Sequence, residues 1–265
     1  MSRIIVITSG KGGVGKTTVT SNLGAALARL NRKVALVDAD FGLRNLDLLL
    51  GLEERVVYTA LDVLAGECRL AQALVKHKQL SGLVLLPAAQ NRNKESVEPE
   101  QMKTIITALA KGYDYIVVDS PAGIELGFRN AIVAAQEALI VTTPEIAAVR
   151  DADRVIGLLE AEGVSKINLI VNRVKPHMIE ENKMMSVEDV LELLGVPLIG
   201  VVPDNEQVIV ATNRGEPLVI GHQDSLPGLA FQNIARRIEG EKVPFLDFSV
   251  GEGNILTRLR KIFGG

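Results

Sequence analysis

The chain of 265 residues is 47% hydrophobic and only 3% aromatic, and its formal net charge of −3 excludes a strongly basic protein drawn to nucleic acid by charge alone. Its single cysteine, Cys68, excludes an internal disulfide and any Cys-x-x-Cys metal or iron–sulfur site. No apolar run approaches the roughly 18 residues of a spanning helix, and the first strand is predicted to begin by Ile4, so we expect a cytoplasmic protein without a signal peptide.

Short apolar runs, mostly β-branched, alternate along the chain with stretches of helical periodicity. The runs that predict buried strands are residues 4–7, 34–37, 83–86, 116–118, 139–141, 167–171 and 198–202. The stretches that predict helices are residues 16–30, 61–64, 70–75, 100–110, 130–135, 147–162, 187–194, 207–213 and 228–238. This alternation predicts an α/β fold, a three-layer sandwich in which helices cover both faces of a mostly parallel sheet.

The domain boundaries follow from where the periodic segments end. Residues 1–240 are predicted to form one domain, because no repeat, low-complexity tract or second core interrupts them. Residues 241–254 contain proline, glycine and several acids and predict a linker, and residues 255–265 predict a separate terminal helix. In an open α/β sheet, ligands bind beyond the carboxyl ends of the strands, so residues that follow a strand are the candidates for function.

A glycine-rich loop follows the first predicted strand. It comprises Gly10, Lys11, Gly12, Gly13, Val14, Gly15, Lys16, Thr17 and Thr18. From Gly10 it fits the phosphate-loop pattern of Gly, four residues and Gly-Lys-Thr, in which glycines let backbone N–H groups face phosphate oxygens at the N-terminus of a helix. The pattern predicts a P-loop domain in which Lys16 neutralises the β- and γ-phosphates and the Thr17 hydroxyl binds Mg²⁺.

Carboxylates follow two other predicted strands. Asp38 and Asp40 come after the second strand, and Asp119 comes directly after the fourth. Beside a phosphate loop, a carboxylate can hold Mg²⁺ directly or through water, or can orient an attacking water. Asp119 has the usual Walker B position for a Mg²⁺ ligand. Asp38 and Asp40 are candidates for the same chemistry, although a pair of acids at a strand end can also cap a turn.

Polar residues also follow the last two predicted strands. Asn172 and Arg173 come after the first of these, and the asparagine amide can pair with both the donor and the acceptor edge of adenine. A hydroxyl or a lone charge cannot reproduce that pattern of two hydrogen bonds. Pro203 and Asp204 follow the last strand and are expected to line the base pocket, although Asp204 could equally cap the next helix.

The end of the chain has an amphipathic pattern. On a helix, one face would carry Ile255, Leu256, Leu259, Ile262 and Phe263, and the other would carry Arg258, Arg260 and Lys261. This predicts an interfacial helix that buries its apolar side in a membrane surface and turns its cations toward anionic lipids. The alternative is a helix docked on its own domain, but the segment is shorter than the roughly 12 to 15 residues needed for even marginal helicity in water.

Lys11 departs from a generic phosphate loop, which needs no basic residue at that position. With Lys11, the loop resembles the deviant Walker A signature, and the chain is identified as a member of the ParA/MinD family of ATPases. The resemblance implies a Mg²⁺-dependent ATP hydrolase that forms a homodimer with ATP, in which Lys11 reaches the partner's phosphates. It also implies catalytic roles for Lys11, Lys16 and Asp40, with Asp40 orienting the attacking water, a supporting role near Mg²⁺ for Asp38, and adenine binding by Asn172.

The terminal Ile-Phe-Gly-Gly, with basic residues before it, resembles the membrane-targeting sequence of the septum-placing members of this family. That resemblance implies a peripheral protein that cycles between the cytoplasm and the inner face of the cell membrane. It would recruit a division inhibitor and be released when a stimulating partner accelerates hydrolysis, with Asp151 as an expected partner contact. Two alternatives stay open, a ParA-like ATPase that segregates DNA or plasmids and a regulator of flagellar number. We expect no nucleic-acid partner.

Overall fold

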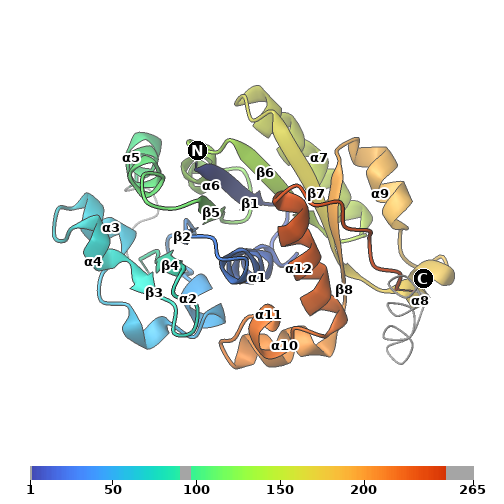
Figure 1. The fold of residues 1–265 in the computed structure, drawn as a ribbon. Helices are drawn as coiled ribbons and strands as arrows, with labels where there is room; N and C mark the ends of the chain where they lie inside the picture. The colour runs from blue at the N-terminus through green and yellow to red at the C-terminus, as the bar shows by residue number, and fades with distance from the viewer. Residues whose placement is uncertain (1, 90–96, 249–265) are drawn as a thin grey trace.

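The computed structural model describes residues 2–89 and 97–248, and within them the strands form one eight-stranded sheet (Figure 1). The strands are β1 (Arg3–Thr8), β2 (Val34–Asp38), β3 (Val75–Lys76), β4 (Leu83–Leu86), β5 (Tyr115–Asp119), β6 (Glu137–Thr142), β7 (Lys166–Val174) and β8 (Leu198–Pro203). Their order is β3-β4-β2-β5-β1-β6-β7-β8, and neighbours are parallel except for β3 and β4. β1 therefore lies inside the sheet, between β5 and β6.

Helices cover both faces of the sheet, as predicted. They are α1 (Lys16–Arg29), α2 (Leu46–Leu49), α3 (Ala60–Leu64), α4 (Leu70–Ala73), α5 (Pro99–Leu109), α6 (Leu126–Ile132), α7 (Ile146–Ala161), α8 (Pro176–Glu180), α9 (Val187–Leu194), α10 (Glu206–Asn213), α11 (Leu218–Gly221) and α12 (Leu226–Ile238), with a 3-10 turn at Glu53–Arg55. One hydrophobic core includes side chains of α1, α11 and α12, and the other includes side chains of α5, α6, α7 and α9 (Figure 1). The predicted three-layer α/β sandwich is confirmed.

The residues of β1 show why a continuous apolar run forms a central strand. Ile4 and Val6 belong to one hydrophobic core, and Ile5 and Ile7 belong to the other. Successive side chains of a strand point to opposite faces of the sheet, so an uninterrupted apolar run is stable where helices cover both faces. In such central strands, polar side chains are therefore found mainly at the strand ends.

Short elements account for most differences from the predicted pattern. The sequence analysis missed β3, α2, α8 and α11, which have two to five residues each and are too short to show a period. The predicted helix at 70–75 is wrong at its end, because α4 stops at Ala73 and Val75 begins β3. The predicted helix at 130–135 is displaced, because α6 already begins at Leu126, where nearby glycines give the sequence the composition of a loop.

The first part of the predicted linker lies against the domain. Arg237 of α12 donates hydrogen bonds to the carbonyl oxygens of Val243 at 2.9 Å and Pro244 at 2.8 Å. Its guanidinium carbon also lies 4.1 Å from the centre of the Phe245 ring. This arginine therefore ties the start of the linker to the last helix of the domain. Residues 249–265, which include the predicted terminal helix, lie outside the described residues, so the boundary at 254 stays a prediction.

Candidate functional site

The glycine-rich loop lies where it was predicted, between β1 and α1 at the carboxyl edge of the sheet. Gly13 and Gly15 have φ angles of 79° and 102°, in the left-handed region that favours glycine. At Gly10 the reason is space, because a Cβ atom there would lie 2.2 Å from the backbone oxygen of Asp151 in α7. The glycines are therefore required both by the turn of the loop and by the packing of α7 against it.

Lys16 begins α1 and is buried, with 8% of its surface exposed. Its ammonium donates a hydrogen bond to Ser9 Oγ at 3.0 Å, and Ser9 Oγ donates one to the Lys11 carbonyl at 2.8 Å. Burial lowers the pKa of Lys16, while the charges of Asp119 and Asp40 act in the opposite direction. Because a buried cation is unfavourable unless an opposite charge lies near it, the position of Lys16 favours an anionic ligand such as a phosphate.

Lys11 has different surroundings, although it belongs to the same loop. Its Nζ atom lies 3.2 Å from Glu145 Oε2, and both side chains are about half exposed. Exposed ion pairs of this kind contribute roughly 0.2–1 kcal/mol to stability, so Lys11 can leave Glu145 at little cost. Within one loop, Lys16 is therefore buried and Lys11 faces solvent.

Asp38 and Asp119 lie side by side at the carboxyl edge, where they are paired in register across β2 and β5. Asp119 accepts hydrogen bonds from the hydroxyls of Thr20, at 3.0 Å, and Thr17, and Asp38 accepts one from the Asp40 amide at 3.0 Å. Burial raises the pKa of Asp119 to about 6. Burial, with the charge of Asp119, also raises the pKa of Asp38 well above its usual range. A cation at this edge would relieve both effects.

The oxygen atoms at this edge fit a magnesium ion that arrives with a phosphate. Thr17, Asp38 and Asp119 offer the hard oxygen donors that Mg²⁺ prefers. Within residues 2–89 and 97–248, no group of three or more His, Cys, Asp or Glu side chains is placed to hold a metal by itself. Mg²⁺ in phosphate sites is held by one or two carboxylates, and substrate phosphates and waters complete its shell. The donor set therefore suits a metal–nucleotide complex rather than a metal held by protein alone.

Replacing Asp119 by asparagine is expected to stabilise the nucleotide-free protein at pH 8 but not at pH 4. The folded pKa of about 6 exceeds the ordinary value of 3.8, so the folded protein retains a proton that the unfolded chain releases. Wild-type stability therefore falls as the pH rises between about 4 and 6, and the variant should be more stable by roughly 3 kcal/mol above that window. Urea unfolding midpoints measured across this pH range test the expectation, and a gain of equal size at every pH would contradict it.

Asp40 lies just beyond Asp38 and is partly exposed. It lines a cavity of about 250 Å³ together with residues that follow β5, among them Pro121 and Glu125. Burial lowers the pKa of Lys16 and the charge of Asp40 opposes that shift, so the carboxylate lies within electrostatic reach of the loop. The structure thus brings Asp40 to the loop, and its role in orienting water stays a prediction.

Asn172 lies inside β7, so the expectation that it follows the strand is wrong. β7 continues to Val174, which pairs with Pro203 of β8 beyond an irregularity in the register. The Asn172 side chain is buried, and its Nδ2 atom donates a hydrogen bond to the carbonyl oxygen of Val14 in the glycine-rich loop at 2.7 Å. The predicted base-binding residue therefore contacts the loop, and its contact with adenine stays a prediction.

Arg173 and Asp204 line a cavity of about 760 Å³ that also includes Glu145, the partner of Lys11. This volume lies within the roughly 300–1,000 Å³ of small-molecule sites. Asp204 pairs with Lys175 at 3.2 Å, and it does not cap α10, because Asn205 does so. The alternative role of Asp204 as a helix cap is therefore wrong, and its place in the base pocket stays a prediction.

Two further predicted residues lie around this edge. Pro203 is buried at the end of β8. The backbone of Asp151 packs against Gly10, while its partly exposed side chain lies 3.9 Å from Arg154. Asp151 is thus close to the loop, and its contact with a partner protein stays a prediction.

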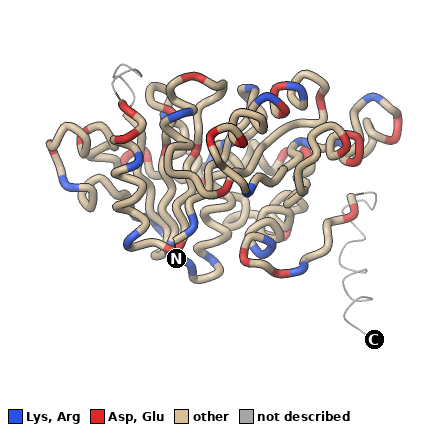
Figure 2. Tube along the Cα trace, turned by 90° about the horizontal axis from the view of Figure 1, so that it is seen from above, with Lys and Arg blue, Asp and Glu red and all other residues tan. Residues whose placement is uncertain are grey.

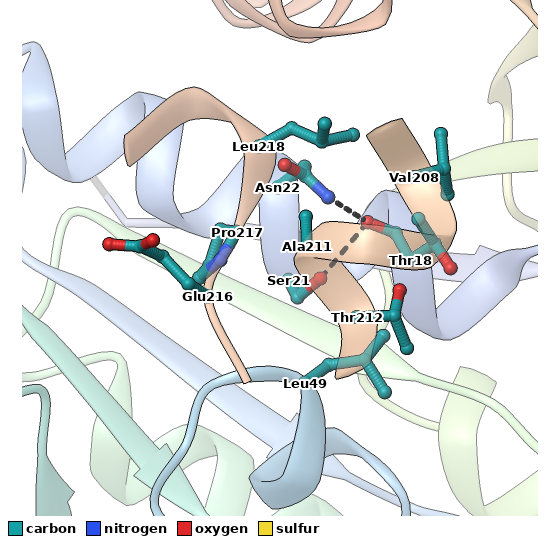
Figure 3. Close-up of a pocket in the computed structure, with 10 residues that line it drawn as sticks. All are labelled: Thr18, Ser21, Asn22, Leu49, Val208, Ala211, Thr212, Glu216, Pro217 and Leu218. Atoms are coloured by element: carbon teal, nitrogen blue, oxygen red, sulfur yellow. Dashed lines mark hydrogen bonds between the residues drawn. The ribbon is translucent and has the colours of Figure 1, made fainter. Parts of the chain in front are cut away.

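A small cavity lies between α1 and the helices α10 and α11, and hydrogen bonds beside it hold α1 in place (Figure 3). The carbonyl oxygen of Thr18 accepts hydrogen bonds from Asn22 Nδ2 at 2.9 Å and from Ser21 Oγ at 3.0 Å. Asn22 Oδ1 in turn accepts one from the amide of Val219 in α11 at 3.3 Å. The cavity measures about 10 Å³, which is close to the room that a single water needs. These contacts fix the helix that carries Lys16.

The sequence analysis missed Ser9 and Thr20 as parts of the site, and it did not predict that Glu145 pairs with Lys11. Each had a signal that could have found it. Ser9 stands at the end of the first strand, and Thr20 comes four residues after Lys16, on the same face of α1. Glu145 comes shortly after β6, and Asp38 and Asp119 end β2 and β5.

A central parallel strand leads through a glycine-rich loop into a helix with a buried lysine, and a neighbouring strand ends in a buried aspartate. This arrangement defines a P-loop nucleotide-binding protein. The model of the CobQ/CobB/MinD/ParA nucleotide binding domain matches residues 5–218. The chain therefore belongs to this family.

Individual relatives and solved structures show which members of this family the chain is similar to. Septum site-determining protein MinD of Synechocystis sp. is 65% identical, and the match covers 100% of both chains. MinD in the MinC:MinD cell division protein complex of Aquifex aeolicus is 47% identical with a TM-score of 0.87, over 93% of this chain and 99% of that one. MinD of Pyrococcus horikoshii, complexed with Mg-ADP, is 35% identical with a TM-score of 0.83, over 90% and 96% of the two chains.

Proposed function

We propose that this chain is an ATPase that places the division septum by cycling on and off the inner membrane surface. It binds ATP with Mg²⁺, forms a homodimer, attaches through residues 255–265 and recruits a division inhibitor. It leaves the membrane after partner-stimulated hydrolysis of ATP to ADP and phosphate. The observation that carries the proposal is the pair of lysines, one buried and one facing solvent, in a chain 65% identical to a septum site-determining protein along its whole length.

The phosphate end of the nucleotide is assigned to the loop and the strand ends beside it. Lys16 holds the β- and γ-phosphates, while Thr17, Asp38 and Asp119 lie on the side of Mg²⁺ and Asp40 orients the attacking water. Mg²⁺ supplies positive charge that stabilises the transferred phosphoryl group. The Mg-ADP complex of the Pyrococcus relative supports the binding of a nucleotide with Mg²⁺.

The base end of the nucleotide is assigned to Asn172, Arg173, Pro203 and Asp204. Arg173 and Asp204 line the cavity of about 760 Å³. Glu145 lines the same cavity and pairs with Lys11, so the cavity lies next to the phosphate loop. A ligand with a base at one end and phosphates at the other matches this arrangement.

The homodimer is the proposed active state, because Lys11 can then supply a cation to the partner's phosphates. A cation provided by another subunit offsets charge that develops on the phosphoryl group, as an arginine finger does. The solved complex of an Aquifex relative with MinC supports a MinC-like division inhibitor as a partner. A MinE-like protein is the proposed stimulator of hydrolysis. Asp151 is the proposed contact for this protein or for the division inhibitor.

Membrane attachment rests on the amphipathic pattern of residues 255–265, with its apolar and cationic faces. In the part of the chain that the structure describes, no helix is long and apolar enough to cross a membrane. A single short interfacial helix binds weakly, but a dimer carries two, which can raise the overall affinity by about 10² to 10⁴. ATP would therefore control attachment through dimerisation, and the protein would move between cytoplasm and membrane.

A ParA-like ATPase that segregates DNA is the second candidate, and it would need a basic surface for the phosphate backbone. Figure 2 shows Lys and Arg interspersed with Asp and Glu along the described chain, and the net charge is −3. These observations favour the membrane over DNA. Among residues 2–89 and 97–248, no feature favours the third candidate, a regulator of flagellar number.

The full-length protein is expected to co-sediment with vesicles that contain anionic lipid in the presence of ATP, and to stay in the supernatant with ADP. Deleting residues 255–265 should lower vesicle affinity at least about 100-fold, because both anchors of the dimer are lost. Replacing Arg258 and Lys261 by glutamate should weaken binding to anionic vesicles through charge repulsion. Nucleotide binding serves as the control and should not change. Sedimentation that ignores the nucleotide, or binding to duplex DNA in place of vesicles, would refute the proposal.

A further inference from the structure

We propose that Asn172 is a positioning residue of the phosphate loop, in addition to its proposed contact with the base. This inference rests on the proposed binding of ATP at the loop. Asn172 belongs to β7, which is separated from β1 by β6, so it holds the loop from outside the loop's own strand and helix. Its removal should therefore weaken the binding of phosphates even when the ligand has no base.

The contact that carries this inference joins Asn172 Nδ2 to the Val14 carbonyl oxygen at 2.7 Å. Asn172 is 6% exposed, so water competes little for the hydrogen bond. A carbonyl oxygen can only accept, and the asparagine must therefore turn its NH₂ group toward the loop. Gly15 makes the approach possible, because a Cβ atom there would lie 2.4 Å from Asn172 Nδ2. Gly15 is thus required by this contact as well as by its φ of 102°.

Holding the Val14 carbonyl also sets the direction of the next N–H group. In a trans peptide the C=O and N–H bonds lie in one plane and point in opposite directions. The described residues contain no cis peptide bond, so the Gly15 N–H points away from Asn172. Phosphate loops bind their ligand through backbone N–H groups of this kind. Asn172 therefore sets the direction of the Gly15 N–H, one of the donors that would bind a phosphate oxygen.

A contact of the same type holds the start of the loop. Ser9 Oγ donates to the Lys11 carbonyl at 2.8 Å and so sets the direction of the Gly12 N–H. Glycine-rich segments lose much conformational entropy when they become ordered. A loop that is ordered before the ligand arrives binds more tightly, because less entropy is lost on binding. Asn172 thus contributes to affinity without touching a phosphate.

The test compares two ligands, Mg²⁺–ATP and Mg²⁺–tripolyphosphate, by isothermal titration calorimetry on the full-length protein. Tripolyphosphate has no base, so it reports on the loop alone. Asn172→Ala should weaken tripolyphosphate binding about tenfold, the upper range for the net worth of a single hydrogen bond. Asn172→Asp should weaken it at least as much, since it faces the Val14 carbonyl with another oxygen. Asn168→Ala is the matched control, with the same residue type on the same strand, nearer the start of β7 and paired in register with Leu139 of β6.

The outcomes separate the inference from its alternatives. If the Asn172 variants bind tripolyphosphate like wild type and lose affinity for ATP alone, Asn172 contacts only the base and the inference is wrong. If they lose thermal stability with no change in tripolyphosphate affinity, the contact serves only the fold, and the inference is again wrong. Wild-type protein that binds ATP but not tripolyphosphate would also overturn it, because the loop would not be ready for phosphates. Wild-type protein that binds neither ligand would instead overturn the proposed function. If the alanine variant does not fold, the nearly isosteric aspartate variant decides.

Discussion

Replacing Lys16 by glutamine is expected to lower the affinity for Mg²⁺–ATP at least about 100-fold while leaving the nucleotide-free fold as stable as wild type or more so. Two unit charges about 4 Å apart interact by about 4 kcal/mol at an effective dielectric constant of about 20, and a loss of about two thirds of that value already lowers the affinity about 100-fold. The stability of the free protein should not fall, because burial already lowers the pKa of Lys16 and disfavours its charge.

The Lys16 expectation is checked by calorimetric titration of ATP and by thermal unfolding of the free protein. Lys33→Gln is the matched control, because it removes an exposed lysine ahead of β2, outside the loop. Its affinity for ATP should stay within about twofold of wild type, in keeping with the small effects of surface substitutions. A Lys16 variant that binds ATP normally would mean that another group neutralises the phosphates. A variant that fails to fold would contradict the view that the buried charge is unfavourable.

Replacing Lys11 by alanine is expected to separate nucleotide binding from activity. The variant should bind ATP as a monomer within about threefold of wild type, because its exposed ion pair with Glu145 is worth less than about 1 kcal/mol. It should fail to form the ATP-dependent dimer, and its stimulated hydrolysis should fall at least about 100-fold, since a cation supplied by another subunit can contribute a factor of 10³ to 10⁵. Sedimentation analysis with ATP and a phosphate-release assay measure the two losses.

The control for Lys11 is Lys103→Ala on α5, which removes another exposed ion pair, with Glu100 at 3.4 Å, far along the chain from the loop. It should leave dimerisation and hydrolysis unchanged. Mixing the Lys11 variant with the Lys16 variant adds a stricter test, because only a lysine acting between subunits would let one variant compensate for the other. A Lys11 variant with a normal stimulated rate would show that Lys11 takes no part in hydrolysis, and a failure of the two variants to compensate would show that it does not act between subunits.

Much of the fold could be predicted because the informative patterns are local. Apolar runs of three to five residues and helical periodicity over seven or more predicted most of the strands and the longer helices, and the structure differs mainly at elements of two to five residues. The loop, the strand before it and the helix after it are contiguous, so their chemistry is visible in one stretch. The expectation that Asp38 and Asp119 share an edge also held, because parallel strands end at the same side of a sheet.

The sequence by itself was enough to predict that the glycine-rich loop, its two lysines and the strand-end acids belong to the site. Motif spacing and strand periodicity indicate them without knowledge of any distant contact. The tertiary structure decided which groups meet them. The Asn172 contact with Val14 spans 158 positions, and the Lys11 contact with Glu145 spans 134. Such pairs depend on the order of strands in the sheet, where β6 and β7 follow β1 in space but not in sequence. Periodicity reports the face on which a residue lies, whereas its partner is set by the strand or helix that the fold places opposite.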